Sequence, residues 1–127
     1  QEPGGFTFAG ARLGIYQYSG NSYRCLSGDR YSLGCRRTPA KIEFAQRRIE
    51  HDGSERIFLA SDGYRDQSGG TRGFSLGKKR FINILNHTRT LGSKDCNRYI
   101  LDQLRQYQGS LPQRDDITVL GFLNIYA

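Results

Sequence analysis

Apolar and polar residues alternate along the first part of the chain in the way that β-strands require. Residues 6–9 predict a short strand that ends at Gly10. Residues 13–18 alternate apolar with small or polar side chains, residues 19–21 form a turn signal, and residues 22–26 return in the opposite direction. This pattern predicts a β-hairpin near the N-terminus.

The middle of the chain predicts one loop and two more strands. Residues 27–40 carry two glycines and a proline and predict a loop. Residues 41–50 place Ile42, Phe44 and Ile49 among polar residues, which is typical of a half-buried strand. Residues 56–60 form a short continuous apolar run, which indicates a strand covered on both faces.

Helical periodicity replaces the strand pattern in the last third of the chain, after an irregular stretch that follows residue 63. Residues 77–87 predict one helix, and Ser93 is a good N-cap for a second helix that ends at Gly109. Residues 117–126 predict a final apolar strand. The order of these elements predicts one α+β domain, or part of one.

Length and composition fit a globular protein and exclude several other classes. The chain has 127 residues, 36% of them apolar, with 8 Tyr and 7 Phe, which is enough to bury a core. No apolar run approaches the ~18 residues that a membrane-spanning helix needs, so we expect no membrane contact by this segment. Its three cysteines lack CxxC spacing and its two histidines stand apart, which indicates free thiols in a reducing cytoplasm and no zinc site.

The net charge of +7 raises the question of nucleic-acid binding. The lysines and arginines are scattered along the chain with acidic residues between them, and no zinc-finger or aromatic RNA-binding motif accompanies them. An acidic or phosphorylated protein partner explains the surplus equally well. We therefore expect no nucleic-acid partner.

Two aspartates stand at the ends of predicted strands. Asp62 follows the apolar run 56–60, and Asp115 precedes the final strand. If these strands are antiparallel neighbours, they lie ~4.8 Å apart and the two aspartates meet at one edge of the sheet. Carboxylates without His or Cys partners suit Mg²⁺ or Mn²⁺, and Gly63 would let other groups approach closely. Acidic residues are also common at strand ends for reasons unrelated to metals, so spacing alone leaves both interpretations open.

Five short motifs, taken together, suggest a family. They are Phe8-Ala9-Gly10-Ala11, Gly28-Asp29-Arg30, Ser61-Asp62-Gly63-Tyr64-Arg65-Asp66-Gln67, Gly77-Lys78-Lys79-Arg80-Phe81 and Gln113-Arg114-Asp115-Asp116-Ile117-Thr118-Val119. In their order and approximate spacing, the chain resembles the SpoIIE/RsbU-like branch of the PPM family of metal-dependent serine/threonine phosphatases.

The resemblance implies a fold, a reaction and a set of ligands. The fold would be part of a PPM-type αββα sandwich, in which two packed antiparallel sheets are flanked by helices. The reaction would be hydrolysis of phosphoserine or phosphothreonine on a protein with two Mn²⁺ or Mg²⁺ ions. Asp62 and Asp115 would be metal ligands, whereas Asp66 and Asp116 would be accessory groups.

The resemblance also implies that these residues are not the whole catalytic domain. The family supplies further ligands from a segment that would precede residue 1, so we expect residues 1–127 to be a C-terminal half that lacks its N-terminal half. Such a fragment would bind metal weakly, show little activity alone and tend to dimerise through open strand edges. The parent would be a signalling protein with upstream sensory modules, through which it could be anchored to a membrane.

The partner and the role of three arginines follow from the same resemblance. The expected substrate is a STAS-like anti-sigma-factor antagonist of a partner-switching circuit. The alternative is a non-catalytic phosphatase-like module that binds a signalling protein without hydrolysis. Arg30, Arg36 and Arg37 lie in the predicted loop 27–40, where they would either contact the substrate phosphate or remain solvated.

Overall fold

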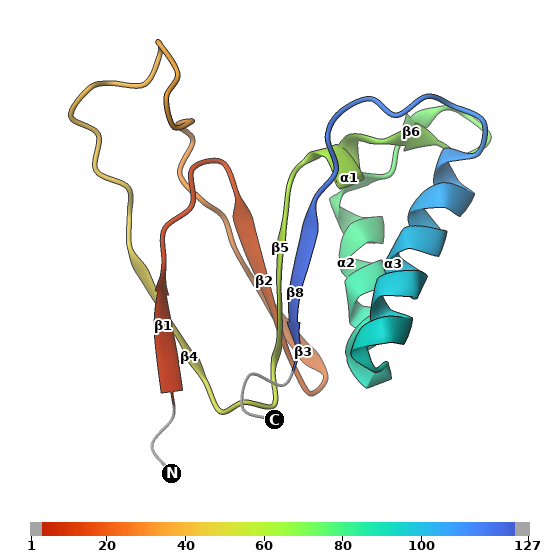
Figure 1. Ribbon diagram of the computed structural model, residues 1–127, viewed down its shortest axis with the longest axis horizontal. Coiled ribbons are helices and arrows are strands. Elements are labelled where there is room, and N and C mark those ends of the chain that lie inside the picture. Colours follow the sequence, from red (N-terminus) through yellow and green to blue (C-terminus); the bar gives the residue numbers. More distant parts are fainter. Residues whose placement is uncertain (1–3, 124–127) are drawn as a thin grey trace. The chain divides into compact units, whose positions relative to one another are not determined.

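The computed structural model describes residues 4–123, which form two compact units (Figure 1). The first unit runs to Leu59 and resumes at Gly121, and the second comprises Ala60–Leu120.

The first unit is built from two β-sheets. Its strands are β1 (Gly4–Phe8), β2 (Gly14–Ser19), β3 (Ser22–Leu26), β4 (Arg47–His51), β5 (Arg56–Ala60) and β8 (Val119–Leu123), of which β5 and β8 continue at one end into the second unit. One sheet pairs β1 with β4, and the other has the order β3-β2-β5-β8.

The β1–β4 and β2–β3 pairings in this unit are antiparallel. Ile15 lies opposite Leu26 and Ser19 lies opposite Ser22, which confirms the predicted hairpin. The turn between these strands contains Gly20 at φ +52°, a left-handed conformation that glycine adopts without strain. In the smaller sheet, Phe6 lies opposite Ile49.

The apolar positions of both sheets meet in one core. Phe8 of β1 and Ile49 of β4 pack with Ile15 of β2 and Ile57 of β5, and all four side chains are buried. Because these residues come from different sheets, the two sheets pack face to face through them. The alternation seen in the sequence therefore has its physical cause in this shared interior.

The strand predicted over residues 41–50 is wrong in its first half, because β4 begins only at Arg47. Residues 41–46 are irregular, and the Ala45 N–H donates to the Asp29 carboxylate at 2.7 Å rather than to a neighbouring strand. The same aspartate also bonds through its backbone to Gly10 and Arg12. This side-chain contact holds both ends of the long loop together and keeps the chain out of the sheet.

The second unit contains the helices. Its elements are α1 (Gly63–Asp66), β6 (Ser68–Gly69), β7 (Phe74–Ser75), α2 (Gly77–His87), the 3₁₀ turn η1 (Thr88–Thr90) and α3 (Ser93–Gln108). The bounds of α2 are those that the sequence predicted. Its buried side chains are Phe81, Ile84 and Leu85, whereas those of α3 are Cys96, Ile100 and Leu104.

Three predictions about element boundaries need correction. Gly92, not Ser93, is the N-cap of α3, and Ser93 is its first residue. The stretch after residue 63 is more ordered than expected, since it holds α1 and the β6–β7 hairpin. The final strand begins at Val119, two residues later than predicted, because residues 116 and 118 bond to Ser61. Residues 124–126 of that predicted strand lie outside the described part of the chain.

Among residues 4–123, no helix has the length and apolar character needed to cross a membrane.

Candidate functional site

The strands that carry the two predicted aspartates are neighbours in the larger sheet. The Ser61 N–H donates to the Thr118 carbonyl at 3.0 Å, and Gly121 lies against the Phe58 ring. Ser61 is paired with Thr118, whereas Phe58, earlier in the chain, contacts Gly121, later in the chain, so β5 and β8 are antiparallel. The end of β5 and the start of β8 therefore lie next to each other at one edge of the sheet, within the second unit. This edge, which carries Asp62 and Asp115, is called the aspartate edge. The strand arrangement on which the metal hypothesis depended is confirmed.

Ser61 forms hydrogen bonds between the two chain segments that meet at the aspartate edge. Its hydroxyl oxygen accepts the Thr118 N–H at 3.0 Å, and the hydroxyl donates to the Asp116 carbonyl at 3.2 Å. Together with the backbone bond to Thr118, these contacts fix the register between the segment before β8 and the end of β5.

Gly63 brings the two backbones into direct contact. A methyl group at this position would collide with the carbonyl oxygen of Asp116, which is backbone and cannot rotate away. The φ of Gly63 is not positive, so glycine is required here for space. The Asp62-Gly63 turn and the segment that carries Asp115 and Asp116 consequently lie against each other.

Both aspartates of the edge are exposed. Asp62 occupies the N-cap position of α1, yet its carboxylate makes no capping hydrogen bond. Asp115 accepts the Asp116 N–H at 2.7 Å through one carboxylate oxygen, which leaves its other oxygen uncommitted to that bond. Asp66, at the end of α1, and Asp116 are exposed as well.

Gln67 is a second link between these segments, and it is completely buried. Its amide nitrogen donates to the carbonyl oxygens of Ser68 and Pro112, each at 3.0 Å. Its amide oxygen accepts the Arg114 N–H at 3.3 Å. The loop that leads into Asp115 is therefore bonded to the residue that directly follows α1.

Sequence reasoning missed the structural roles of Ser61 and Gln67. Both belong to a motif that the sequence analysis singled out, but only Asp62, Gly63 and Asp66 within it were given roles. Apart from Ser68, the partners of these two side chains lie 45 to 57 positions away, so no local pattern reveals them.

The carboxylates at the aspartate edge are the type of ligand that a hard divalent cation prefers, but there are too few of them to complete a site. Carboxylate oxygens are the ligands that Mg²⁺ and Mn²⁺ prefer, and the Asp62 carboxylate is not used to cap its helix. Within residues 4–123, however, no three His, Cys, Asp or Glu side chains gather closely enough to hold a metal ion. Asp62 and Asp115 alone would leave the coordination shell of such an ion incomplete.

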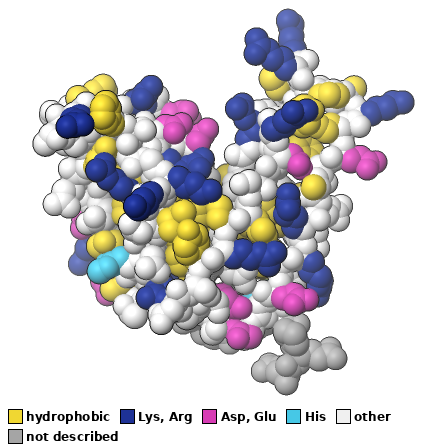
Figure 2. All heavy atoms as spheres, turned by 180° about the vertical axis from the view of Figure 1, so that it is seen from behind, with side chains coloured by type: hydrophobic (Ala, Val, Ile, Leu, Met, Phe, Trp, Pro, Cys, Tyr) yellow, Lys and Arg dark blue, Asp and Glu magenta, His cyan; other side chains and the backbone are white. Residues whose placement is uncertain are grey.

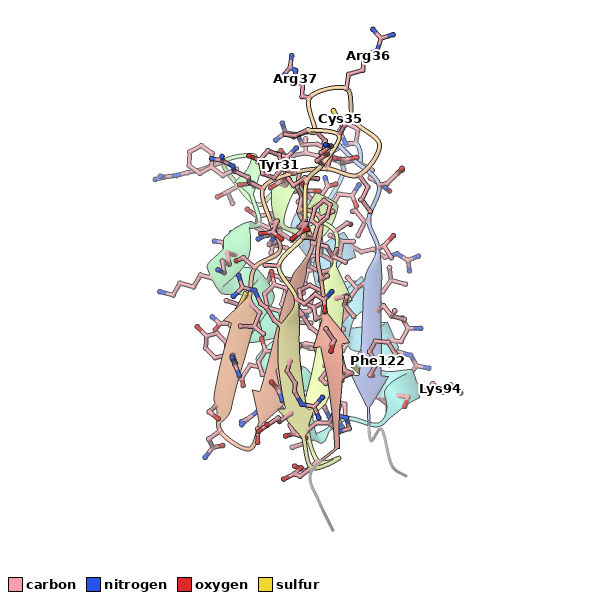
Figure 3. The ribbon with its side chains drawn as sticks, turned by 90° about the vertical axis from the view of Figure 1, so that its left-hand side faces the viewer. Tyr31, Cys35, Arg36, Arg37, Lys94 and Phe122 are labelled. Carbon is pink, nitrogen blue, oxygen red and sulfur yellow. The ribbon has the colours of Figure 1, made fainter. Side chains whose placement is uncertain are left out.

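The three arginines proposed as substrate contacts belong to the loop of the first unit. Arg30 lies over the ring of its neighbour Tyr31, with 5.0 Å from the guanidinium carbon to the ring centroid, and donates to the Tyr31 hydroxyl at 2.9 Å. Arg36 and Arg37 are exposed at the far end of the loop and point outward, away from the strands (Figure 3). Arg30 is thus held by an aromatic contact, whereas Arg36 and Arg37 reach into solvent.

Comparison with known proteins places this arrangement in a family. The family model described as Stage II sporulation protein E (SpoIIE) matches residues 14–122, which is most of the chain. The chain belongs to the SpoIIE family. The matched segment includes the aspartate edge, Ser61 and Gln67. No curated protein matches the chain.

A solved structure supports the same assignment. The SiaA-PP2C domain of Pseudomonas aeruginosa is 30% identical, has a TM-score of 0.82 and matches over 94% of this chain. The SpoIIE-family chain spans 46% of the length of that structure. The predicted fold class is confirmed as α+β with packed antiparallel sheets, and the chain is part of a PPM-type phosphatase domain.

Proposed function

We propose that the domain containing this chain is a metal-dependent protein-serine/threonine phosphatase. The observation that carries the proposal is the aspartate edge itself. The Ser61 hydroxyl and the close contact at Gly63 hold Asp62 and Asp115 on adjoining segments, in a chain that belongs to the SpoIIE family. Two exposed carboxylates at one edge are suited to a divalent cation.

Asp62 and Asp115 would hold the metal, and their neighbours would support them. Gly63 permits the close backbone approach, while Asp66 and Asp116 are accessory acids on the two sides of the edge. When bound, Mn²⁺ or Mg²⁺ supplies an activated water and charge compensation for phosphoryl oxygens. The residues of this chain fix where that chemistry takes place.

Two carboxylates do not complete a binuclear centre, so the remaining ligands would come from chain outside residues 1–127. The 46% coverage of the SiaA-PP2C domain structure is consistent with this division. Residues 1–127 would then be the C-terminal half of the domain, with little activity of their own. Dimerisation through open strand edges is the expected behaviour of such a half.

The proposed substrate is a phosphoserine or phosphothreonine on a regulatory protein of the anti-sigma-factor antagonist type, with a STAS-like fold. Membership of the SpoIIE family supports this choice. Arg36 and Arg37, which extend into solvent, and Arg30 are the proposed contacts for the substrate phosphate. The setting would be a cytoplasmic partner-switching circuit.

Metal titration by calorimetry on the complete domain tests the ligand assignment. Asp62→Asn and Asp115→Asn should each weaken Mn²⁺ binding by about tenfold or more, because each removes a charged ligand. Asp102→Asn, an exposed acid on α3, is the matched control and should leave the affinity unchanged. Unchanged affinity in both edge variants would mean that the assignment is wrong.

A second experiment separates the phosphatase from the alternative, a non-catalytic module that binds a signalling partner. A phosphoserine-containing protein of the STAS type should lose its phosphate in the presence of Mn²⁺ and the complete domain. Binding of that protein without release of phosphate would favour the module instead.

A further inference from the structure

A groove runs between α2 and α3 in the second unit and encloses about 360 Å³. Residues spaced three and four apart on α2 share a face, as do residues four apart on α3. The side chains that line the walls are Arg80, Asn83 and His87 from α2 and Tyr99, Gln103 and Tyr107 from α3. This set is called the α2–α3 groove.

The two helices run antiparallel, and an aromatic contact joins them near each end of the groove. At one end the Arg80 guanidinium lies 4.9 Å from the centroid of the Tyr107 ring. At the other end the His87 ring stacks on Tyr99, with centroids 4.8 Å apart. Arg80 and His87 are seven positions apart on α2, which corresponds to about 10 Å along the helix. That length accommodates about three residues of an extended peptide.

The groove offers chemistry for a peptide that carries both acidic and apolar groups. Leu76 and Ile84 are buried and supply apolar surface, while the amides of Asn83 and Gln103 can pair with a peptide backbone. The contact with Tyr107 holds the Arg80 guanidinium against a ring face and leaves its N–H edge able to donate to a carboxylate. None of the residues that line the groove is acidic.

The positive charge of α2 and α3 also favours an acidic ligand. Residues 77–108 contain seven Lys or Arg and two Asp, a surplus of five out of the net +7 of the whole chain. Lysine and arginine side chains outnumber acidic ones on the face shown in Figure 2. A positive field of this kind attracts and orients an acidic partner.

We propose that the α2–α3 groove is a docking site for a short acidic segment of a partner protein. A carboxylate of the segment pairs with Arg80, and an adjacent apolar side chain rests on Ile84 between the two tyrosines. This site is separate from the aspartate edge in its residues and does not depend on phosphatase activity.

Fluorescence anisotropy on the intact protein tests the site with a labelled peptide, Asp-Glu-Leu-Glu-Asp. The peptide should bind, and its amide counterpart, Asn-Gln-Leu-Gln-Asn, should bind at least about tenfold more weakly, because it lacks the charge that Arg80 would meet. Equal binding of the two peptides, or no binding of the acidic one, would overturn the proposal.

Paired variants separate the groove from the general charge of the helices. Arg80→Gln should weaken binding by about tenfold, whereas Lys78→Gln removes the same charge from the same helix outside the groove and should have an effect below about twofold. His87→Ala should also weaken binding, with Asn86→Ala as its control. Equal losses of peptide affinity in Arg80→Gln and Lys78→Gln would overturn the proposal. Tighter binding of a single-stranded oligonucleotide than of the peptide would do the same.

Discussion

Ser61 and Thr118 hold each other through two hydrogen bonds, although 57 positions separate them in the chain. The Ser61 N–H donates to the Thr118 carbonyl, and the Ser61 hydroxyl oxygen accepts the Thr118 N–H, each at 3.0 Å. Asp62 follows the first residue directly, and Asp115 lies three positions before the second. The placement of the two carboxylates therefore depends on a serine that need not touch a metal itself.

Replacing Ser61 should destabilise the contact between the two segments of the aspartate edge. Ser61→Ala removes the acceptor for the Thr118 N–H and the donor to Asp116, so we expect a loss of about 1 kcal/mol in the free energy of unfolding and weaker Mn²⁺ binding by the complete domain. Denaturant titration and calorimetry measure the two effects. Ser61→Thr keeps the hydroxyl and should retain metal affinity, and Ser110→Ala, at an exposed position, should change neither quantity. Equal metal binding by Ser61→Ala and the parent would contradict the role given to this hydroxyl.

Adding one methyl group at Gly63 should be costly. Gly63→Ala places a Cβ against the Asp116 carbonyl oxygen, and relief requires the backbone to move, so we expect about 3 kcal/mol of destabilisation. Gly14→Ala is the matched control, because its Cβ would meet only ordinary contacts at 3.6 Å and beyond. Thermal melts of the two variants compare them directly. Similar melting temperatures would show that the backbone at Gly63 accommodates a methyl group at little cost, and the prediction would be wrong.

The buried amide of Gln67 should not tolerate a carboxylate. Gln67→Glu places a carboxylate oxygen against the carbonyl oxygens of Ser68 and Pro112, so we expect a loss of about 3 kcal/mol at neutral pH. Burial should raise the pKa of the new carboxyl above its unfolded value, so the deficit should be smallest at acidic pH and grow as the pH rises. Gln106→Glu, at an exposed position of α3, makes the same chemical change. Denaturation curves at several pH values decide the matter, and a pH-independent deficit would contradict this explanation.

Tyr64 should contribute to stability until the solution becomes strongly alkaline. Its hydroxyl donates to the Ile100 carbonyl at 2.7 Å, and burial, reinforced by nearby Tyr99, raises the pKa of the Tyr64 phenol. A raised folded-state pKa means that this contribution is complete below the unfolded value of about 10 and is lost as the pH rises above it.

Tyr64→Phe therefore has two expected effects. It should cost about 1 kcal/mol at neutral pH, because the Ile100 carbonyl loses its donor, and it should make stability less sensitive to pH above about 10. Tyr23→Phe, an exposed tyrosine in the first unit, is the control. An alkaline unfolding profile that is identical in Tyr64→Phe and the parent protein would contradict the prediction.

Local patterns predicted the regular elements well and the irregular ones poorly. The bounds of α2 and β5 could be predicted because a helical stripe and a continuous apolar run are short-range signals. The strand predicted over residues 41–50 was wrong in its first half because the Asp29 carboxylate binds the Ala45 N–H. A side-chain contact across 16 positions overrides local alternation, and nothing in the alternation announces it.

The class of the fold, the identity of the candidate ligands and the net positive charge could all be predicted from the sequence. These follow from periodicity, from the types of residue in the motifs and from simple counting. Only the folded structure shows that Asp62 and Asp115 share one edge, that Ser61 and Gln67 form the hydrogen bonds across it, and that α2 and α3 form a groove lined by Arg80. Each of these depends on residues that are distant in the chain and come together only when apolar surfaces of separate elements are buried against each other.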